Sequence, residues 1–282
     1  MPDLVITDIA SAIHVRHILT PIGDVRWFTR IDRVEIVRAH LDGNMFDFTP
    51  IFPSSAHQPR GGTAGTQGPD GILSRSDLRK ALADDPIERF VRPLASDVLI
   101  EAKSSLNELI ERFRAEQPFM FVVGSGGLEG VVTPSDLNKQ AGRTQLFMQV
   151  CALELALADI VRASARSDDQ LLAVLPEERA QSTAGRYRKQ RERDEAADLV
   201  TAFDLQDLLY VCKGWSAADS VLSKLTSTQI QHLSKFRNTI MHAVLEPAGD
   251  DDVRLKRLLD QTELVAELLA CAEGPGARPS TR

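Results

Sequence analysis

Asp70–Leu78 reads DGILSRSDL, and Glu129–Leu137 reads EGVVTPSDL. Both stretches place an acid before glycine, two apolar residues, Ser or Thr, two further residues and then Asp-Leu. A short apolar run precedes each copy, and a helical pattern follows it. Self-similarity of this kind indicates an internal repeat, and the repeat is the feature of the chain that says most about its fold.

The region around the two copies alternates between short apolar runs and helical patterns. The runs are FTPIF at 48–52, GIL at 71–73, FMFVV at 119–123 and GVV at 130–132. Helical patterns at 32–41 and 105–114 lie between them. This alternation predicts strands and helices in one α+β region. The stretch 53–71, rich in Gly, Ser, Thr and Pro, predicts an irregular loop much longer than an ordinary hairpin turn.

Each copy of the motif has a purely structural explanation. Ser74 with Asp77, and Thr133 with Asp136, have the spacing of a capping box, in which the hydroxyl and the acid satisfy free backbone N–H groups at a helix start. Pro134 suits the first helical position. A strand, a tight turn and a capped helix need no ligand, so one copy alone would say little about function.

The repetition carries a family resemblance. The pattern resembles the CBS domain (cystathionine beta-synthase type), which normally occurs as a tandem pair. The resemblance covers about residues 5 to 140 and implies two βαββα-type repeats, at about 5–85 and 86–140. It also implies an adenine nucleotide (AMP, ADP, ATP or a related molecule) as a regulatory ligand, bound between the repeats.

The resemblance also implies which residues contact the nucleotide. Carried over residue by residue, the hydroxyl and the carboxylate that contact ribose and phosphates are Ser74 and Asp77 in one repeat, and Thr133 and Asp136 in the other. A carboxylate suits two vicinal sugar hydroxyls. The long loop before Gly71 departs from a compact CBS repeat and puts the first site in doubt.

The second half of the chain has a different texture. From about residue 143 to 272, apolar residues recur at spacings of three and four in four segments, which predicts an all-α helical bundle. The stretch 139–143 is the expected domain boundary. The tail 273–282 is expected to be disordered.

One helical segment of this half holds a possible catalytic set. Arg237, Asn238 and His242 form R-N-x-x-x-H, and residues four apart share a helix face. Imidazole can move a proton to or from a ribose oxygen, and guanidinium can stabilise phosphate charge. The alternative is structural: His242 would lie near a helix C-terminus and favour its dipole, while Arg237 would pair with a carboxylate.

The whole segment 143–272 resembles a HEPN domain, a helical bundle found in RNA-cleaving toxins and defence proteins. The match lies in Arg237, Asn238 and His242, with Glu154 in the region where many members carry an acidic residue. The resemblance implies metal-independent cleavage of RNA in a homodimer that brings two motifs together. Some HEPN domains are not catalytic.

A cluster of basic residues fits a nucleic-acid role. The expected RNA-binding residues are Arg186, Arg188, Lys189 and Arg191, with Tyr187 among them as a stacking surface. A solvated loop and helix start is the alternative explanation of the same charges.

Composition excludes several classes. A net charge of -7 argues against sequence-independent coating of nucleic acid. Three distant cysteines without CxxC spacing argue against a zinc site or a disulfide framework. No phosphate loop, metal motif, signal peptide or membrane span is evident, so we expect a cytoplasmic protein with no metal and no membrane partner.

Two functional hypotheses follow. The first is a nucleotide-sensing, metal-independent endoribonuclease, in the style of a toxin or defence protein, which an inhibitory partner protein would restrain. The second is a non-catalytic nucleotide sensor whose helical bundle serves dimerisation or docking. An exposed His242 favours the enzyme, and a buried, hydrogen-bonded one favours the second hypothesis.

Overall fold

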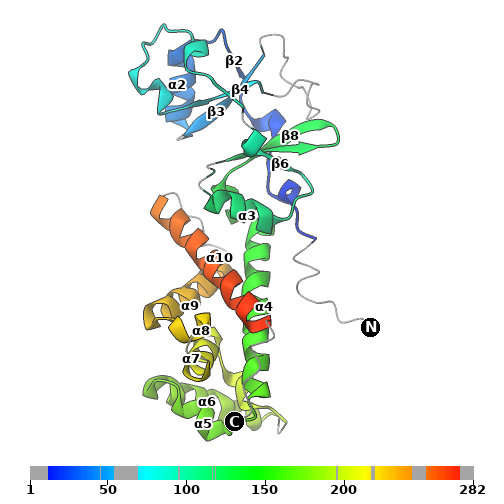
Figure 1. Ribbon diagram of the computed structural model, residues 1–282, viewed down its shortest axis with the longest axis vertical. Coiled ribbons are helices and arrows are strands. Elements are labelled where there is room, and N and C mark those ends of the chain that lie inside the picture. Colours follow the sequence, from blue (N-terminus) through cyan, green and yellow to red (C-terminus); the bar gives the residue numbers. More distant parts are fainter. Residues whose placement is uncertain are drawn as a thin grey trace. The chain divides into compact units, whose positions relative to one another are not determined.

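The computed structural model describes residues 12–44, 46–53, 69–94, 96–115, 117, 119–194, 196–216, 220–242 and 252–273. The fold is mixed α+β. Ile13–Lys139 forms one compact unit, and the helices from Gln140 onward form another (Figure 1). Most of the predicted loop at 53–71 and all but the first residue of the predicted tail lie outside the described residues.

The first unit is built from short strands and helices. Its elements are η1 Val15–His17, β1 Thr20–Pro21, η2 Ile22–Asp24, β2 Phe28–Thr29, α2 Val34–Gly43, β3 Phe48–Phe52, β4 Gly71–Ser74, η3 Asp77–Lys80, η4 Ile87–Arg89, β5 Arg92–Pro93, η5 Ser96–Val98, β6 Leu99–Glu101, α3 Leu106–Arg114, β7 Met120–Gly124, β8 Gly127–Val132 and η6 Pro134–Asn138. The four apolar runs are strands β3, β4, β7 and β8, and the two helical patterns are α2 and α3, as the sequence predicts. The helical starts after the two motifs are only the short 3₁₀ helices η3 and η6.

Two four-stranded sheets carry the internal symmetry. Their strand orders are β2-β3-β4-β5 and β6-β7-β8-β1, with the first pair parallel and the other pairs antiparallel in each. Strand β1 lies near the start of the first expected repeat in sequence but completes the sheet of the second, whereas β5 lies near the start of the second and completes the sheet of the first. The register is equivalent, because Arg92 lies opposite Ile72 as Thr20 lies opposite Val131.

Two apolar clusters hold this unit together. The first lies between α2 and its sheet and includes Val34, Val37, Leu41, Ile51 and Leu73. The second joins side chains of both sheets. In it the Phe48 and Phe119 rings lie 3.8 Å apart, and Trp27 stacks on Phe52 at 3.7 Å. The burial of this aromatic surface fixes one repeat against the other.

The second unit is helical. Its elements are α4 Gln140–Ala163, α5 Asp168–Ala173, α6 Glu177–Arg191, η7 Leu199–Ala202, α7 Leu205–Trp215, α8 Val221–Lys224, α9 Ser227–Met241 and α10 Asp252–Glu273. Helix α4 packs against α7, α9 and α10 (Figure 1). Many of the residues predicted from three- and four-residue spacing are buried in its core, among them Val150, Leu153, Leu233 and Leu268, whereas Phe147 and Cys151 are only half-buried. Among the described residues, no helix is both long and apolar enough to cross a bilayer.

Candidate functional site

The two copies of the repeated motif make the same hydrogen bonds. Ser74 Oγ donates to Asp77 Oδ2 at 2.7 Å, and Thr133 Oγ1 donates to Asp136 Oδ2 at 3.0 Å. The backbone N–H of Ser74 and that of Thr133 donate to the same carboxylate oxygens at 3.2 and 2.7 Å. The structure thus brings each predicted hydroxyl–carboxylate pair together at the end of its strand. These contacts are also those of the capping-box explanation.

The glycine of each motif has a steric reason. A Cβ on Gly71 would lie 2.9 Å from the carbonyl oxygen of Arg92, and one on Gly130 would lie 2.3 Å from that of Thr20. Both are closer than side chains approach backbone. The glycines therefore allow β5 and β1, the two strands exchanged between the repeats, to lie against β4 and β8.

The two carboxylates have different cations. Asp77 pairs with Arg92 on β5, whose side chain is 64% exposed. Asp136 is bonded by Lys139 Nζ at 2.8 Å and by Thr20 Oγ1 at 3.4 Å. Burial would raise the pKa of the Asp77 carboxyl, but hydrogen bonds from Ser74 and Arg92 outweigh it and hold that pKa below its ordinary value.

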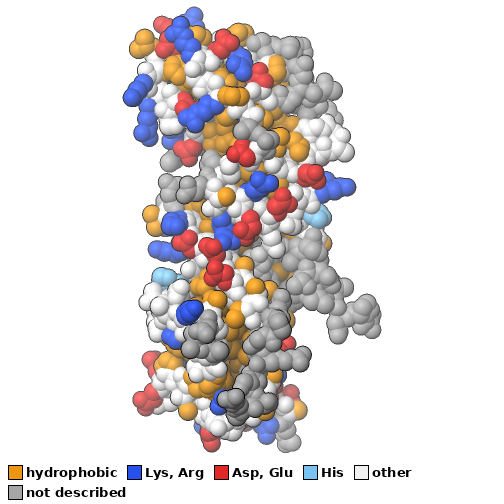
Figure 2. Space-filling model, viewed as in Figure 1, with side chains coloured by type: hydrophobic (Ala, Val, Ile, Leu, Met, Phe, Trp, Pro, Cys, Tyr) orange, Lys and Arg blue, Asp and Glu red, His pale blue; other side chains and the backbone are white. Residues whose placement is uncertain are grey.

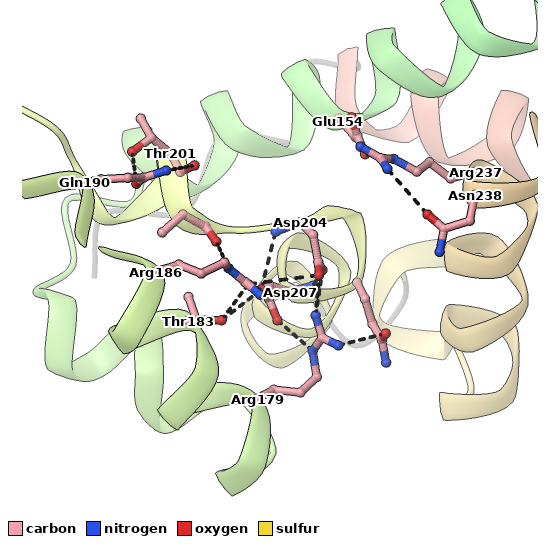
Figure 3. A network of polar contacts seen from close by, with 12 residues as sticks. Glu154, Arg179, Thr183, Arg186, Gln190, Thr201, Asp204, Asp207, Arg237 and Asn238 are labelled. Carbon is pink, nitrogen blue, oxygen red and sulfur yellow. Dashed lines mark hydrogen bonds and ion pairs between the residues drawn. The ribbon is translucent and has the colours of Figure 1, made fainter. Parts of the chain in front are cut away.

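In the helical unit, three of the four expected catalytic residues lie together. Arg237 Nε on α9 lies 3.3 Å from Glu154 Oε1 on α4, and an Arg237 guanidinium N–H donates to Asn238 Oδ1 at 3.4 Å (Figure 3). Burial raises the pKa of the Glu154 carboxyl, although Arg237 opposes that rise. A half-buried carboxylate therefore positions a guanidinium whose remaining donors can meet an anion.

His242 does not continue the helix face that the spacing predicts. Helix α9 ends at Met241, and His242 is its C-cap, with φ -89° and ψ 110°. Arg143 of α4 donates to the carbonyls of Ile240 at 2.9 Å and of His242 at 2.5 Å, which satisfies the end of the helix. The expectation that His242 lies inside the helix is therefore wrong. Its side chain is exposed and, among the described residues, that side chain makes no hydrogen bond with Arg237 or Asn238; the backbone N–H of His242 donates to the Asn238 carbonyl at 3.1 Å.

The expected RNA-binding residues separate into two groups. All four lie in the last turns of α6, where cations favour the helix dipole, not in a loop or at a helix start. Arg188, Lys189 and Arg191 are exposed, but Arg186 donates to Asp207 at 2.7 Å and to the Ala202 carbonyl at 2.9 Å. Acidic and basic side chains are interspersed over the face of the molecule that Figure 2 shows.

Asp207 is the centre of a network that the sequence does not reveal. Its side chain is fully buried and accepts hydrogen bonds from Arg179, Arg186 and Thr183 (Figure 3). Asp204 takes two further bonds from Arg179. The only sequence signal is the Asp204-x-x-Asp207 capping box at the start of α7.

A pocket of about 310 Å³ adjoins this network. Its lining residues are Glu178, Arg179, Ser182, Thr183, Arg186 and Gln206. The two guanidinium groups of the lining already bind Asp204 and Asp207, so they hold α6 on α7. Within the described residues, His, Cys, Asp and Glu form no group of three that would hold a metal ion.

Comparison with known proteins finds matches among solved structures. No family model matches the sequence, and no curated protein matches it. The CBS domain of a bacterial CNNM/CorC family Mg²⁺ transporter in complex with ATP is 18% identical, with a TM-score of 0.36 over 45% of this chain and 85% of that one. CbpB in complex with c-di-AMP is 19% identical, with a TM-score of 0.37 over 49% and 91% of the two chains. CBSX2 in complex with AMP is 15% identical, with a TM-score of 0.34 over 44% and 91%. The chain is thus similar to CBS domains over about half of its length.

Proposed function

We propose that the protein senses an adenine nucleotide through Ile13–Lys139 and controls RNA cleavage by its helical unit. The observation that carries the first part is the duplicated motif. Ser74 with Asp77, and Thr133 with Asp136, make equivalent hydrogen bonds at equivalent strand ends. A carboxylate can accept from two ribose hydroxyls, and a hydroxyl beside a guanidinium can bind phosphate. We choose an adenine nucleotide as the ligand because these motifs resemble those of CBS domains.

Calorimetric titration of the full chain with ATP, ADP and AMP tests the sensing function. Binding should be lost in the double variant Asp77→Asn, Asp136→Asn, because neither motif then offers a carboxylate to the sugar. Asp159→Asn removes an exposed acid of the helical unit and should bind as the wild type does. Equal binding by the double variant would refute the role of the two motifs.

The catalytic part of the proposal rests on the Glu154–Arg237–Asn238 set and on the exposed His242 beyond it. The ribose 2′-OH attacks the neighbouring phosphorus, and the bond to the 5′ oxygen breaks. His242 takes the first proton or gives one to the leaving oxygen. Arg237, positioned by Glu154, stabilises the phosphate charge, and Asn238 orients it. In a homodimer a second copy of the motif would complete the site. The exposed Arg188, Lys189 and Arg191 would attract RNA.

RNA cleavage in EDTA tests this part. We expect the wild type to cleave a mixed RNA substrate, and His242→Ala not to. His232→Ala is the control, because His232 is an exposed histidine of α9 that lies outside the motif. Equal cleavage by wild type and His242→Ala would refute the role of His242.

The second candidate is a non-catalytic sensor with a docking or dimerisation bundle. The observation that favours it is that Arg237 pairs with Glu154 while Arg143 holds the backbone of His242, so both act as structural groups. If this candidate is right, neither the wild type nor His242→Ala cleaves RNA, with or without nucleotide, and Arg237→Ala lowers the stability of the bundle.

A further inference from the structure

The duplicated motifs differ in one neighbour, the residue on the exchanged strand. The register makes Arg92 on β5 and Thr20 on β1 equivalent, because each lies opposite the residue that follows the motif glycine. Arg92 reaches the carboxylate of Asp77 itself. The shorter Thr20 gives Asp136 only a hydroxyl, at 3.4 Å.

The lysine that follows each motif has different contacts in the two copies. Lys80 and Lys139 each stand three residues after the motif aspartate. Lys139 folds back onto Asp136 at 2.8 Å. Lys80 is exposed and, within the part of the chain that is described, makes no ion pair with Asp77, where Arg92 already sits.

The donors of Lys139 are fully used. Its ammonium group lies 2.7 Å from the Ile18 carbonyl, 3.1 Å from that of Leu19 and 3.3 Å from Thr20 Oγ1, besides the Asp136 carboxylate. Four acceptors share three N–H groups, so no donor is left for a phosphate. The Asp136 side chain is only 9% exposed beneath it.

Arg92 is in the opposite condition. Among the described residues, only Asp77 accepts a hydrogen bond from its guanidinium. Four of the five N–H donors of the guanidinium then remain, which is enough to bind a phosphate through two parallel hydrogen bonds. An exposed guanidinium can move away from a carboxylate at little cost, because solvent screens such a pair.

We infer that the two motifs have different roles: the Ser74–Asp77 motif with Arg92 receives the nucleotide, whereas Lys139 closes the Thr133–Asp136 motif as a built-in cation. This inference rests on the proposed sensing function and specifies which copy performs it. The protein then binds one nucleotide per chain, and the second copy serves to fasten β1 and the end of η6 together.

Equilibrium dialysis of the full chain against labelled ATP, and separately AMP, tests the assignment. The wild type should bind about one nucleotide per chain, with affinity at least about tenfold lower in Asp77→Asn and unchanged in Asp136→Asn. Lys139→Met, which keeps the aliphatic stem, should raise the stoichiometry to about two per chain. Lys80→Met is the matched control and should leave it at one.

Exchanging the equivalent residues of β1 and β5, Thr20 and Arg92, gives an independent test. Thr20→Arg places a guanidinium at the second motif and should also raise the stoichiometry to two, while Arg92→Thr should abolish the first site. Unfolding curves of each variant establish that it is folded. Two sites in the wild type, or one site lost in Asp136→Asn rather than Asp77→Asn, would overturn the assignment but leave nucleotide sensing intact. Absence of binding in the wild type and in every folded variant would refute nucleotide sensing itself.

Discussion

Replacing Asp207 with Asn should weaken the helical unit more than any change to an exposed ion pair. Asp207 is fully buried, and Arg179 and Arg186 each donate to it at 2.7 Å. The substitution leaves two guanidinium groups without their shared counter-charge and turns one acceptor into a donor that faces them. Loss of one partner from such a buried network costs about 3–5 kcal/mol. With a urea dependence of about 2 kcal/mol per molar, the unfolding midpoint falls by about 2 M.

Tryptophan fluorescence isolates the relevant unit. The chain has two tryptophans, Trp27 and Trp215, and Trp215 is the last residue of α7, the helix whose first turn holds Asp207. In a Trp27→Phe background, urea unfolding followed at Trp215 reports the helical unit alone. Asp159→Asn is the control: its pair with Arg162, 3.4 Å long and exposed, is worth less than about 1 kcal/mol. A midpoint for Asp207→Asn equal to that of the control would refute the view that this network holds α6 on α7.

Three further changes have defined outcomes. Gly130→Ala should destabilise the first unit by about 1–3 kcal/mol in thermal unfolding, because its Cβ would lie 2.3 Å from a backbone oxygen, whereas Gly126→Ala meets nothing within 4 Å. Burial raises the pKa of the Glu154 carboxyl above its ordinary 4.5 despite Arg237, so the folded state holds that proton more tightly than the unfolded state does. The stability of the wild type relative to Glu154→Gln should therefore fall as the pH rises from about 4 to about 7, and urea unfolding midpoints measure this difference. Arg143→Ala should speed amide hydrogen exchange in the last turn of α9 without changing that of α7, because it frees the carbonyls at the end of α9.

Local pattern accounts for what the sequence predicts well. The apolar runs at 48–52 and 119–123 form strands, and apolar residues spaced three and four apart in α4 and α9 lie in the bundle core. Both patterns are properties of neighbouring residues, so the sequence alone reveals them. The motif hydrogen bonds also span only three residues, as from Ser74 to Asp77. Such contacts form wherever the local backbone allows them.

The remaining features depend on residues far apart in the sequence. The end of α9 is held by Arg143, 99 residues before His242, so the spacing of R-N-x-x-x-H alone did not decide between a histidine inside the helix and one at its end. The buried Asp207 draws its arginines from α6, 21 and 28 residues earlier. Arg186, grouped by composition with exposed cations, is therefore a structural residue.

The strand exchange explains why two nearly identical motifs need not have the same function. Strand β1 brings Thr20 to a carboxylate 116 residues away, and the uncharged Thr20 cannot neutralise it, so Lys139 provides the cation. Lys139 immediately precedes Gln140, the first residue of α4, and α4 carries both Arg143 and Glu154. A ligand that displaced Lys139 would therefore release the residue next to the helix on which the α9 motif depends. At Asp77 a ligand would instead meet Arg92 of β5, whose exposed side chain can move away at little cost.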